Sequence, residues 1–352
     1  MRKKFFYTVL SFVFSLVIAG LAVFWLAQNA LQQPLKLDAE HSLSVVAGTT
    51  PVALLNDLEQ QDIIQGSIWL RLMWRLQQHQ PSVQMGEYSL NPEMTLADLL
   101  EKWRVGDVQN YRVTLVEGWN FAQFRNALAL QELLEQTITD LSDEQVMQLL
   151  ERPGMHPEGR FYPDTYFFTR GQQDIDILRQ ANRRLEQVLA QEWDKRAADL
   201  PYANPDEALT MASIIEKETG AAHERDEIAG VFVRRLRLNM LLQTDPTVIY
   251  GMGEKYNGKI TRADLRKPTP YNTYVNPGLP PTPIAMVGRA AIAAALNPKP
   301  GDSLYFVAKG DGTHEFSRNL QQHNQAVRKY QLKRREGYRS TISPTSTAKE
   351  TP

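Results

Sequence analysis

The chain has 352 residues, which is enough for two domains and a substantial core. Its 39 basic and 40 acidic residues give a net charge of -1, which excludes the overall positive charge typical of nucleic-acid-binding proteins. It contains no cysteine, so disulfide frameworks, thiolate metal sites and cysteine nucleophiles are excluded.

An uncharged run, Phe5 to Ala27, follows three basic residues at the N-terminus. As a helix of about 34 Å it would cross the hydrocarbon core of a membrane. A cleaved signal peptide is the competing interpretation, but its apolar core usually has only about 7–15 residues. We therefore predict that residues 1–28 form a cytoplasmic N-terminus and an uncleaved transmembrane helix, with the rest of the chain on the other side of the membrane.

A polar tether, Gln28 to Ala39, leads into a small α+β region at residues 40–108. Its pattern predicts a strand from Ser42, a helix through Val52–Leu58, a second helix over about Ser67–His79, a strand over Met85–Leu90 and a helix capped by Thr95. The size and order are similar to a LysM-like module. Two roles stay open for it: contact with glycan or placement of the next domain, and a purely structural spacer.

Residues 109–335 are predicted to form a larger α+β domain. The expected elements are a strand over Tyr111–Val116, helices from about Asn120 and over Asp140–Leu150, and a long charged helix over Asp174–Ala198. An aromatic-rich loop, HPEGRFYPDTYFF, occupies His156 to Phe168. Aromatic faces beside acidic groups suit stacking on sugar rings. The alternative is a loop that its aromatic residues pin to the core.

The most informative stretch is a predicted helix over Asn204–Gly220. Asn204 is a suitable cap, Pro205 suits the first helical position, and Glu207 completes a capping-box pattern. Gly220 is a natural stop.

One acidic residue of this helix, Glu218, projects onto its apolar face. At about 100° per residue that face consists of Ala208, Met211, Ile214 and Ile215, and Glu218 follows Met211 by two turns. Apolar surroundings, the negative end of the helix dipole and the like charge of Glu216 all raise the pKa of the Glu218 carboxyl. A raised pKa suits a general acid near neutral pH, whereas the alternative is a structural ion pair with an arginine.

Two polar segments follow the central helix. A helix over Ile228–Leu238 carries an arginine cluster, which we expect to form ion pairs, and Leu242–Tyr250 is a polar turn that opens into an apolar run. Tyr271–Tyr274 then leads into a proline-stiffened loop that ends at Ile284. A stiff loop with amide, hydroxyl and aromatic groups suits a polar ligand, because its groups are positioned at low entropic cost.

The C-terminal part is predicted to contain three more elements and a tail. The elements are a helix over Arg289–Leu296, a strand over Ser303–Ala308 and a polar helix over Phe316–Arg335. The Ser/Thr/Pro-rich tail, residues 336–352, is predicted to be disordered.

Five segments together resemble the MltG/YceG-like endolytic murein transglycosylase family, bacterial membrane-anchored enzymes that cut peptidoglycan glycan strands. They are EGRFYPDTY (Glu158–Tyr166), ASIIEKET (Ala212–Thr219), LQTDPTVIYG (Leu242–Gly251), YNTY with GLPPTPI (Tyr271–Ile284) and LYFVAKGDGTHEFS (Leu304–Ser317). They occur in the family's order and cover most of residues 110–330.

The resemblance implies that Glu218 is the catalytic residue, because the family's catalytic glutamate is the second of its EKE segment. Two departures are visible. Arg234 stands where the family usually has Asn before Arg-Leu, and Thr282 stands where it usually has Gly in the proline loop. Arg234 puts in doubt a polar contact that the Asn makes in the family. Thr282 puts in doubt the backbone path of the proline loop.

The implied reaction is cleavage between N-acetylmuramic acid and N-acetylglucosamine with formation of a 1,6-anhydro ring, and endolytic cleavage is implied by the resemblance alone. From loop chemistry and motif position, the candidate sugar-binding residues are Glu158, Tyr162, Gln243, Asp245, Tyr271, Asn272 and Tyr274. Two alternatives stay open: a hydrolase with Glu158 or Asp245 as second carboxylate, and a non-catalytic peptidoglycan-binding scaffold.

The expected partners are peptidoglycan glycan strands, the membrane through one N-terminal helix, and, as candidates, peptidoglycan synthases. The anchor and the family together imply an inner-membrane protein with a periplasmic catalytic domain, which argues against nucleic acid as a partner. The six histidines are scattered, and neither an HExxH pair nor a glycine-rich phosphate loop occurs, so no metal or cofactor is predicted.

Overall fold

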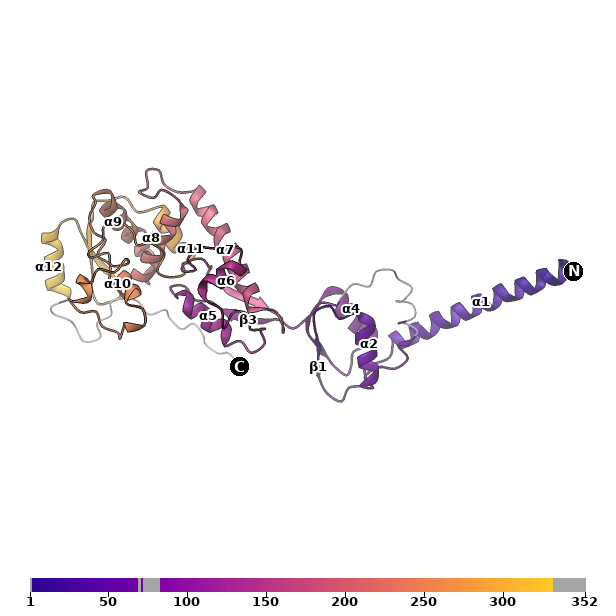
Figure 1. The fold of residues 1–352 in the computed structure, drawn as a ribbon. Coiled ribbons are helices and arrows are strands. Elements are labelled where there is room, and N and C mark those ends of the chain that lie inside the picture. Colours follow the sequence, from indigo (N-terminus) through magenta and orange to yellow (C-terminus); the bar gives the residue numbers. More distant parts are fainter. Residues whose placement is uncertain (1, 69–70, 72–82, 332–352) are drawn as a thin grey trace. The chain divides into compact units, whose positions relative to one another are not determined.

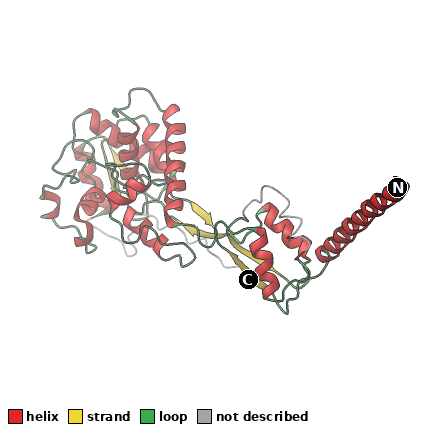
Figure 2. Ribbon diagram, turned by 45° about the vertical axis from the view of Figure 1, so that its right-hand side comes forward, coloured by secondary structure: helices red, strands yellow, loops and turns green. Residues whose placement is uncertain are grey.

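The computed structural model describes residues 2–68, 71 and 83–331 (Figure 1). It is a mixed α and β protein that begins with an apolar helix, as predicted, and its strands are short beside its helices (Figure 2). The chain forms two compact units. The first contains the described residues of Met1–Arg112, Glu132–Glu135 and Phe167–Gln173, and the second those of Val113–Gln131, Gln136–Tyr166 and Asp174–Pro352.

The N-terminal helix, α1, spans Arg2–Leu31. Its segment Leu10–Leu31 is the one described stretch that is long and apolar enough to cross a membrane, and only 6% of its most apolar window is buried. The predicted tether from Gln28 is wrong at its start, because the helix continues to Leu31. Ala27 and Ala30 are 2% and 3% exposed, and this packing extends the helix beyond the predicted end of the apolar run.

The rest of the first unit pairs two strands beside two helices. These elements are β1 (His41–Val45), α2 (Pro51–Gln60), β2 (Gly86–Leu90) and α4 (Leu96–Val105). The strands are antiparallel, with His41 opposite Leu90 and Val45 opposite Gly86. Thr95 caps α4 as predicted. The second helix expected at Ser67–His79 lies mostly outside the described residues, so the LysM-like assignment stays a prediction.

The second unit contains most of the remaining helices. Its elements are α5 (Phe121–Ala129), α6 (Asp143–Leu149), α7 (Asp174–Asp194), α8 (Pro205–Glu218), α9 (Arg225–Arg237), α10 (Asp245–Met252), α11 (Arg289–Leu296), β5 (Tyr305–Ala308), β6 (His314–Ser317) and α12 (Leu320–Tyr330). Two further strands, β3 (Tyr111–Thr114) and β4 (Thr165–Phe168), pair with each other, and the residues of each are divided between the two units.

One predicted helix boundary near the C-terminus is wrong. Phe316, expected to begin a helix, lies in β6 opposite Phe306 of the antiparallel partner β5. The helix α12 begins only at Leu320, after the cap Asn319, because the aromatic pairing between the strands uses Phe316. The end of the predicted helix and the tail at residues 336–352 lie outside the described residues.

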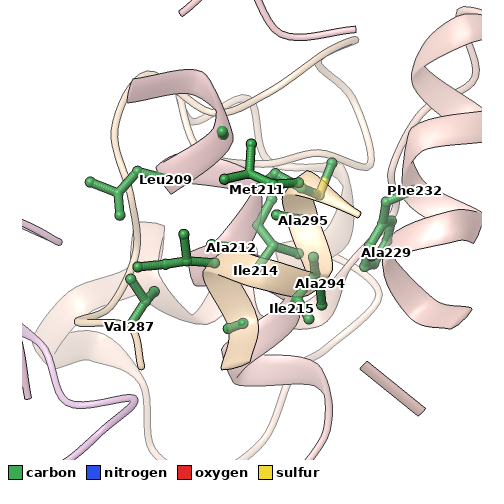
Figure 3. Close-up of a cluster of buried hydrophobic side chains, with 14 of the residues drawn as sticks. Leu209, Met211, Ala212, Ile214, Ile215, Ala229, Phe232, Val287, Ala294 and Ala295 are labelled. Atoms are coloured by element: carbon green, nitrogen blue, oxygen red, sulfur yellow. The ribbon is translucent and has the colours of Figure 1, made fainter. Parts of the chain in front are cut away.

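Helix α8 lies at the centre of the second unit's hydrophobic core, where it packs against α7, α9, α10 and α11 (Figures 1 and 3). The predicted apolar face is buried, but it was too narrow: Leu209, Thr210, Ala212 and Ser213 are buried as well. The two hydroxyl groups are tolerated there because each donates to a backbone carbonyl, of Asp206 and Thr210 respectively.

The ends of α8 differ in detail from the prediction. Asn204 caps the helix by accepting the Glu207 N–H at 3.0 Å, and Pro205 is the first helical residue, as predicted. The capping box is wrong, because the Glu207 carboxylate accepts from Ala203 N–H rather than from the cap. The helix ends at Glu218 with an extended Thr219, not at Gly220.

Candidate active site

Glu218 occupies the last turn of α8 and meets the start of α10. The Thr244 hydroxyl donates a hydrogen bond to the Glu218 carboxyl. Thr244 is the residue before α10 and is 1% exposed, yet its side chain makes no capping bond. Its hydroxyl therefore orients the carboxyl of Glu218 instead of capping α10.

Burial raises the pKa of Glu218 to about 7. The bond from Thr244 and the charge of Arg235 lower this pKa, and the like charge of Asp245 raises it. The described residues give Glu218 no ion-pair partner, and Arg235 acts on it at longer range. This excludes the structural ion pair within the described part of the chain.

The like charge that acts on Glu218 is not the one predicted. Glu216 accepts a bond from Gly288 N–H at 3.1 Å, and its carboxylate lies 3.7 Å from the guanidinium of Arg225. Asp245 takes the place of Glu216 in raising the pKa of Glu218. The reason is tertiary, since α10 packs against α8.

Three of the predicted sugar-binding residues lie beside Glu218. Asp245 is exposed and accepts a bond from the Tyr274 hydroxyl at 2.6 Å, while burial and then this bond raise the pKa of Tyr274. Gln243 is exposed with φ 52°, a left-handed conformation uncommon for a residue other than glycine. Its N–H donates to the Thr273 carbonyl, which holds this backbone in place.

Sequence reasoning missed Arg235 as a residue of this site. Its guanidinium is 7% exposed and donates to the carbonyls of Leu304 and Leu242, each at 2.7 Å, and it lies 5.1 Å from the centroid of the Tyr305 ring. The expected ion pairs of the arginine cluster are wrong for Arg235, because its bonds go to backbone carbonyls.

The other two arginines of the cluster bind carbonyls too. Arg234 donates to Ser303 and Lys299, and Arg237 to Asp199. Arg234, the departure from the family pattern, therefore fastens α9 to the segment before β5.

Glu158 and Tyr271, two further predicted residues, are joined through Tyr250. The Glu158 carboxyl is 3% exposed, accepts from Phe121 N–H at 3.2 Å and from the Tyr250 hydroxyl at 3.1 Å, and has one oxygen without a partner among the described residues. The rings of Tyr250 and Tyr271 contact each other with centroids 4.8 Å apart. The Tyr271 hydroxyl lies 2.8 Å from the hydroxyl of Thr282. Thr282, which stands where the family usually has Gly, therefore gives the proline loop a contact to Tyr271.

Asn272 and Tyr162 are the remaining predicted residues. Asn272 is 1% exposed, and its amide donates to the carbonyls of Asp264, Leu265 and Lys267. Tyr162 packs against the core with the Arg184 guanidinium 5.7 Å from its ring centroid. Both side chains make structural contacts, and neither touches Glu218 in a described hydrogen bond.

Replacing Thr244 with valine should lower kcat by about 10–100-fold, since a hydrogen bond to a charged group contributes about 1.5–3 kcal/mol. The valine keeps the shape of the side chain but frees the Glu218 carboxyl. Thr244→Ser retains the hydroxyl and should keep most of the activity. Steady-state kinetics of both variants would test this, and equal losses in the two would contradict it.

Replacing Glu158 with glutamine should flatten the dependence of the unfolding free energy on pH. Burial raises the pKa of Glu158 to about 7, so between about pH 4.5 and 7 the folded state keeps a proton that the unfolded state releases. Stability is therefore lost as the pH rises through this window, by up to about 3 kcal/mol. Urea unfolding at pH 5 and pH 8 measures this. The exposed Glu315→Gln should leave the slope unchanged, and a Glu158→Gln curve parallel to wild type would contradict the expectation.

A cavity of about 550 Å³ lies at the opposite end of α8 from Glu218. Its lining includes Asn204, Asp206 and Glu207 and the proline loop from Gly278 to Pro283. Helix α8 has 14 residues, so its two ends lie roughly 20 Å apart. This cavity is therefore distinct from the site at Glu218.

Comparison with known proteins gives a consistent result. The model of the YceG-like family matches residues 43–329. The chain is 31% identical over 339 residues to the endolytic murein transglycosylase of Bacillus subtilis strain 168, covering 90% of this chain and 91% of that protein. It is 24% identical over 357 residues to the endolytic murein transglycosylase of Streptococcus pneumoniae serotype 2, where it spans 64% of the longer protein. A crystal structure of a yceG-like protein from Listeria monocytogenes matches with a TM-score of 0.52 and 30% identity, over 81% of this chain and 98% of that one.

Proposed function

This chain belongs to the YceG-like family, and from that premise we propose that Glu218 is the catalytic residue of a lytic transglycosylase that cuts peptidoglycan glycan strands at internal glycosidic bonds. The observation that carries the assignment is one partly buried carboxyl with a pKa of about 7, oriented by a threonine hydroxyl and free of any described ion pair. Such a carboxyl is protonated in a large fraction of molecules at neutral pH and can both give and take a proton.

The reaction requires a single carboxyl. Protonated Glu218 donates its proton to the glycosidic oxygen between N-acetylmuramic acid and N-acetylglucosamine, and the bond from C1 to that oxygen breaks. The muramoyl C6 hydroxyl attacks C1 and gives its proton to the Glu218 carboxylate, which restores the acid. The product is a 1,6-anhydro ring, and because the nucleophile belongs to the same sugar, proximity replaces an activated water.

The neighbouring residues have separate roles in this proposal. Thr244 holds the carboxyl, burial raises its pKa, Asp245 adds to the rise and Arg235 limits it. Gln243, Asp245 and Tyr274 are the sugar-binding candidates nearest to Glu218. Glu158 and Tyr271 lie further from Glu218. Glu158 accepts the Tyr250 hydroxyl, the Tyr250 ring contacts Tyr271, and Tyr271 contacts the proline loop.

A two-carboxylate hydrolase is less well supported. Glu158 is 3% exposed, so its carboxyl has little access to the water that a hydrolase must activate. Asp245 is exposed but already accepts the Tyr274 hydroxyl. A non-catalytic scaffold would give no reason for a carboxyl held at a pKa near 7.

We propose a location for the protein from α1 and the basic residues at its start. We place this helix in the inner membrane with its N-terminus in the cytoplasm, because three basic residues precede the apolar run. The domain around Glu218 is then periplasmic, where nascent glycan strands and the synthases that make them are its partners. The region at residues 40–108 would contact glycan or position the catalytic domain.

Product analysis tests the proposal. Purified full-length protein in detergent is incubated with glycan strands, and the new ends are identified by mass spectrometry. We expect 1,6-anhydromuramoyl ends, which are one water lighter than reducing ends. Reducing ends would establish hydrolysis instead, and intact strands would favour the scaffold.

A further inference from the structure

The segment between α10 and Tyr271 carries an excess of positive charge. Residues 253–269 contain five basic and two acidic residues in a chain whose net charge is -1. Three of the basic residues, Lys255, Lys259 and Lys267, line a cavity of about 310 Å³ together with the C-terminal half of α10. We refer to this cavity as the lysine pocket.

The three ammonium groups of the lysine pocket are available to a ligand. Lys255, Lys259 and Lys267 are exposed, and the described part of the chain places no carboxylate within ion-pair distance of any of them. The acidic residue of the pocket, Asp264, accepts from the N–H and hydroxyl of Thr261. The pocket therefore presents three ammonium groups against one carboxylate, an excess of positive charge, beside threonine and asparagine side chains.

The stretch of this loop that ends at Lys267 is held by partly buried hydrogen bonds. The amide of Asn272 donates to the carbonyls of Asp264, Leu265 and Lys267, at 3.2, 3.2 and 2.8 Å. Helix α10 approaches the loop closely at Gly251, where an added Cβ would lie 2.9 Å from the Thr269 hydroxyl. The backbone at Lys267 is thus fixed before any ligand arrives.

The same buried segment connects the lysine pocket to the site at Glu218. Asn272 holds the basic loop, and the adjacent Thr273 accepts a bond from Thr244 N–H at 3.2 Å. Thr244 is the residue before α10, and Met252 of the lysine pocket is the last residue of that helix. The eight residues of α10 span roughly 12 Å.

We propose that the lysine pocket binds the carboxylates of the peptide stem carried by the muramoyl sugar at the cleaved bond. A peptide of about four residues can extend roughly 13 Å, which matches the length of α10. Lysine ammonium groups suit carboxylates as point charges. A pyrophosphate would offer similar charge, but it occurs only at one end of a lipid-linked strand, whereas a stem is present at each internal site of cleavage. The inference rests on the proposed function and specifies which strands the enzyme prefers.

The test compares two substrates with the full-length protein in detergent. One is glycan strands with peptide stems, and the other is the same strands after an amidase has removed the stems. We expect wild type to have a lower KM for the strands with stems. The variant Lys255→Gln/Lys259→Gln/Lys267→Gln should raise the KM for strands with stems by about tenfold, as expected for the loss of three exposed charge contacts. Its kcat, and its KM for the strands without stems, should equal those of wild type.

A matched variant controls for net charge. Lys195→Gln/Lys299→Gln/Lys309→Gln removes the same charge from outside the lysine pocket and should behave as wild type. Equal KM increases on both substrates, or none on either, would overturn the proposal. A wild-type preference for pyrophosphate-capped strands that does not depend on stems would overturn it in favour of lipid-linked substrate. Cleavage of stripped strands by wild type separates these outcomes from failure of the proposed function, in which neither substrate is cut.

Discussion

Glu218→Gln should abolish detectable formation of 1,6-anhydro ends, with a loss of at least about 10²–10⁴-fold in kcat. The amide has nearly the shape of the carboxyl and can still accept the Thr244 hydroxyl bond, so the helix end should keep its structure. It cannot donate a proton to the glycosidic oxygen or accept one from the C6 hydroxyl. The variant should still bind glycan, because the substitution leaves every candidate sugar-binding residue in place.

The matched control is Glu216→Gln on the same helix. Its side chain oxygen can still accept from Gly288 N–H, and it has no place in the proposed reaction. We expect Glu216→Gln to retain activity within a few-fold, with thermal unfolding reported for both variants. Residual cleavage in Glu218→Gln at the level of Glu216→Gln, with both proteins folded, would show that another group is the acid.

The same acid should give wild type a simple pH profile. In the free enzyme Glu218 must be protonated for the first step, so kcat/KM should fall above a pH of about 7 with the loss of one proton. Glu218 is identified as the titrating group if substitutions close to it shift the pH at which kcat/KM falls.

Helix periodicity was sufficient to find Glu218, because the site of a carboxyl on a helix depends only on local geometry. The burial that raises its pKa was predicted for the same reason. The contacts of Glu218 were not predicted: Asp245 was expected to bind sugar, and Thr244 and Arg235 were not expected at the site, since all three reach Glu218 only through tertiary packing. A Thr-Asp-Pro sequence signals the start of a helix, but it does not show that the threonine hydroxyl is used elsewhere.

The roles of polar loop residues are harder to predict from sequence. Sequence identified Asn272 and Glu158 by the chemistry of their side chains, and an amide or a carboxyl suits a sugar or a backbone carbonyl equally well. In the structure both are almost completely buried, and their hydrogen bonds hold loops in place. Burial of a loop residue depends on which segments pack over it, and one sequence does not contain that information.

Arg235→Met should destabilise the folded protein by about 3 kcal/mol or more. Methionine has a similar length but makes none of the bonds to the carbonyls of Leu304 and Leu242, and each buried carbonyl left without a donor costs about 1–3 kcal/mol. Urea unfolding measures the loss. Arg237→Met is the matched control on the same helix, because Arg237 is exposed, and it should cost less than about 1 kcal/mol.

The charge of Arg235 gives this variant a second measurable effect that loss of stability alone would not produce. Its positive charge lowers the pKa of Glu218, so its removal should raise that pKa and move the fall in kcat/KM to higher pH. The profile is measured where the variant is still folded, at a temperature well below its unfolding transition. A destabilised Arg235→Met with an unshifted profile would mean that Arg235 only supports the backbone. A shift in the expected direction would show that the same guanidinium both anchors the segment before α10 and sets the proton affinity of the acid.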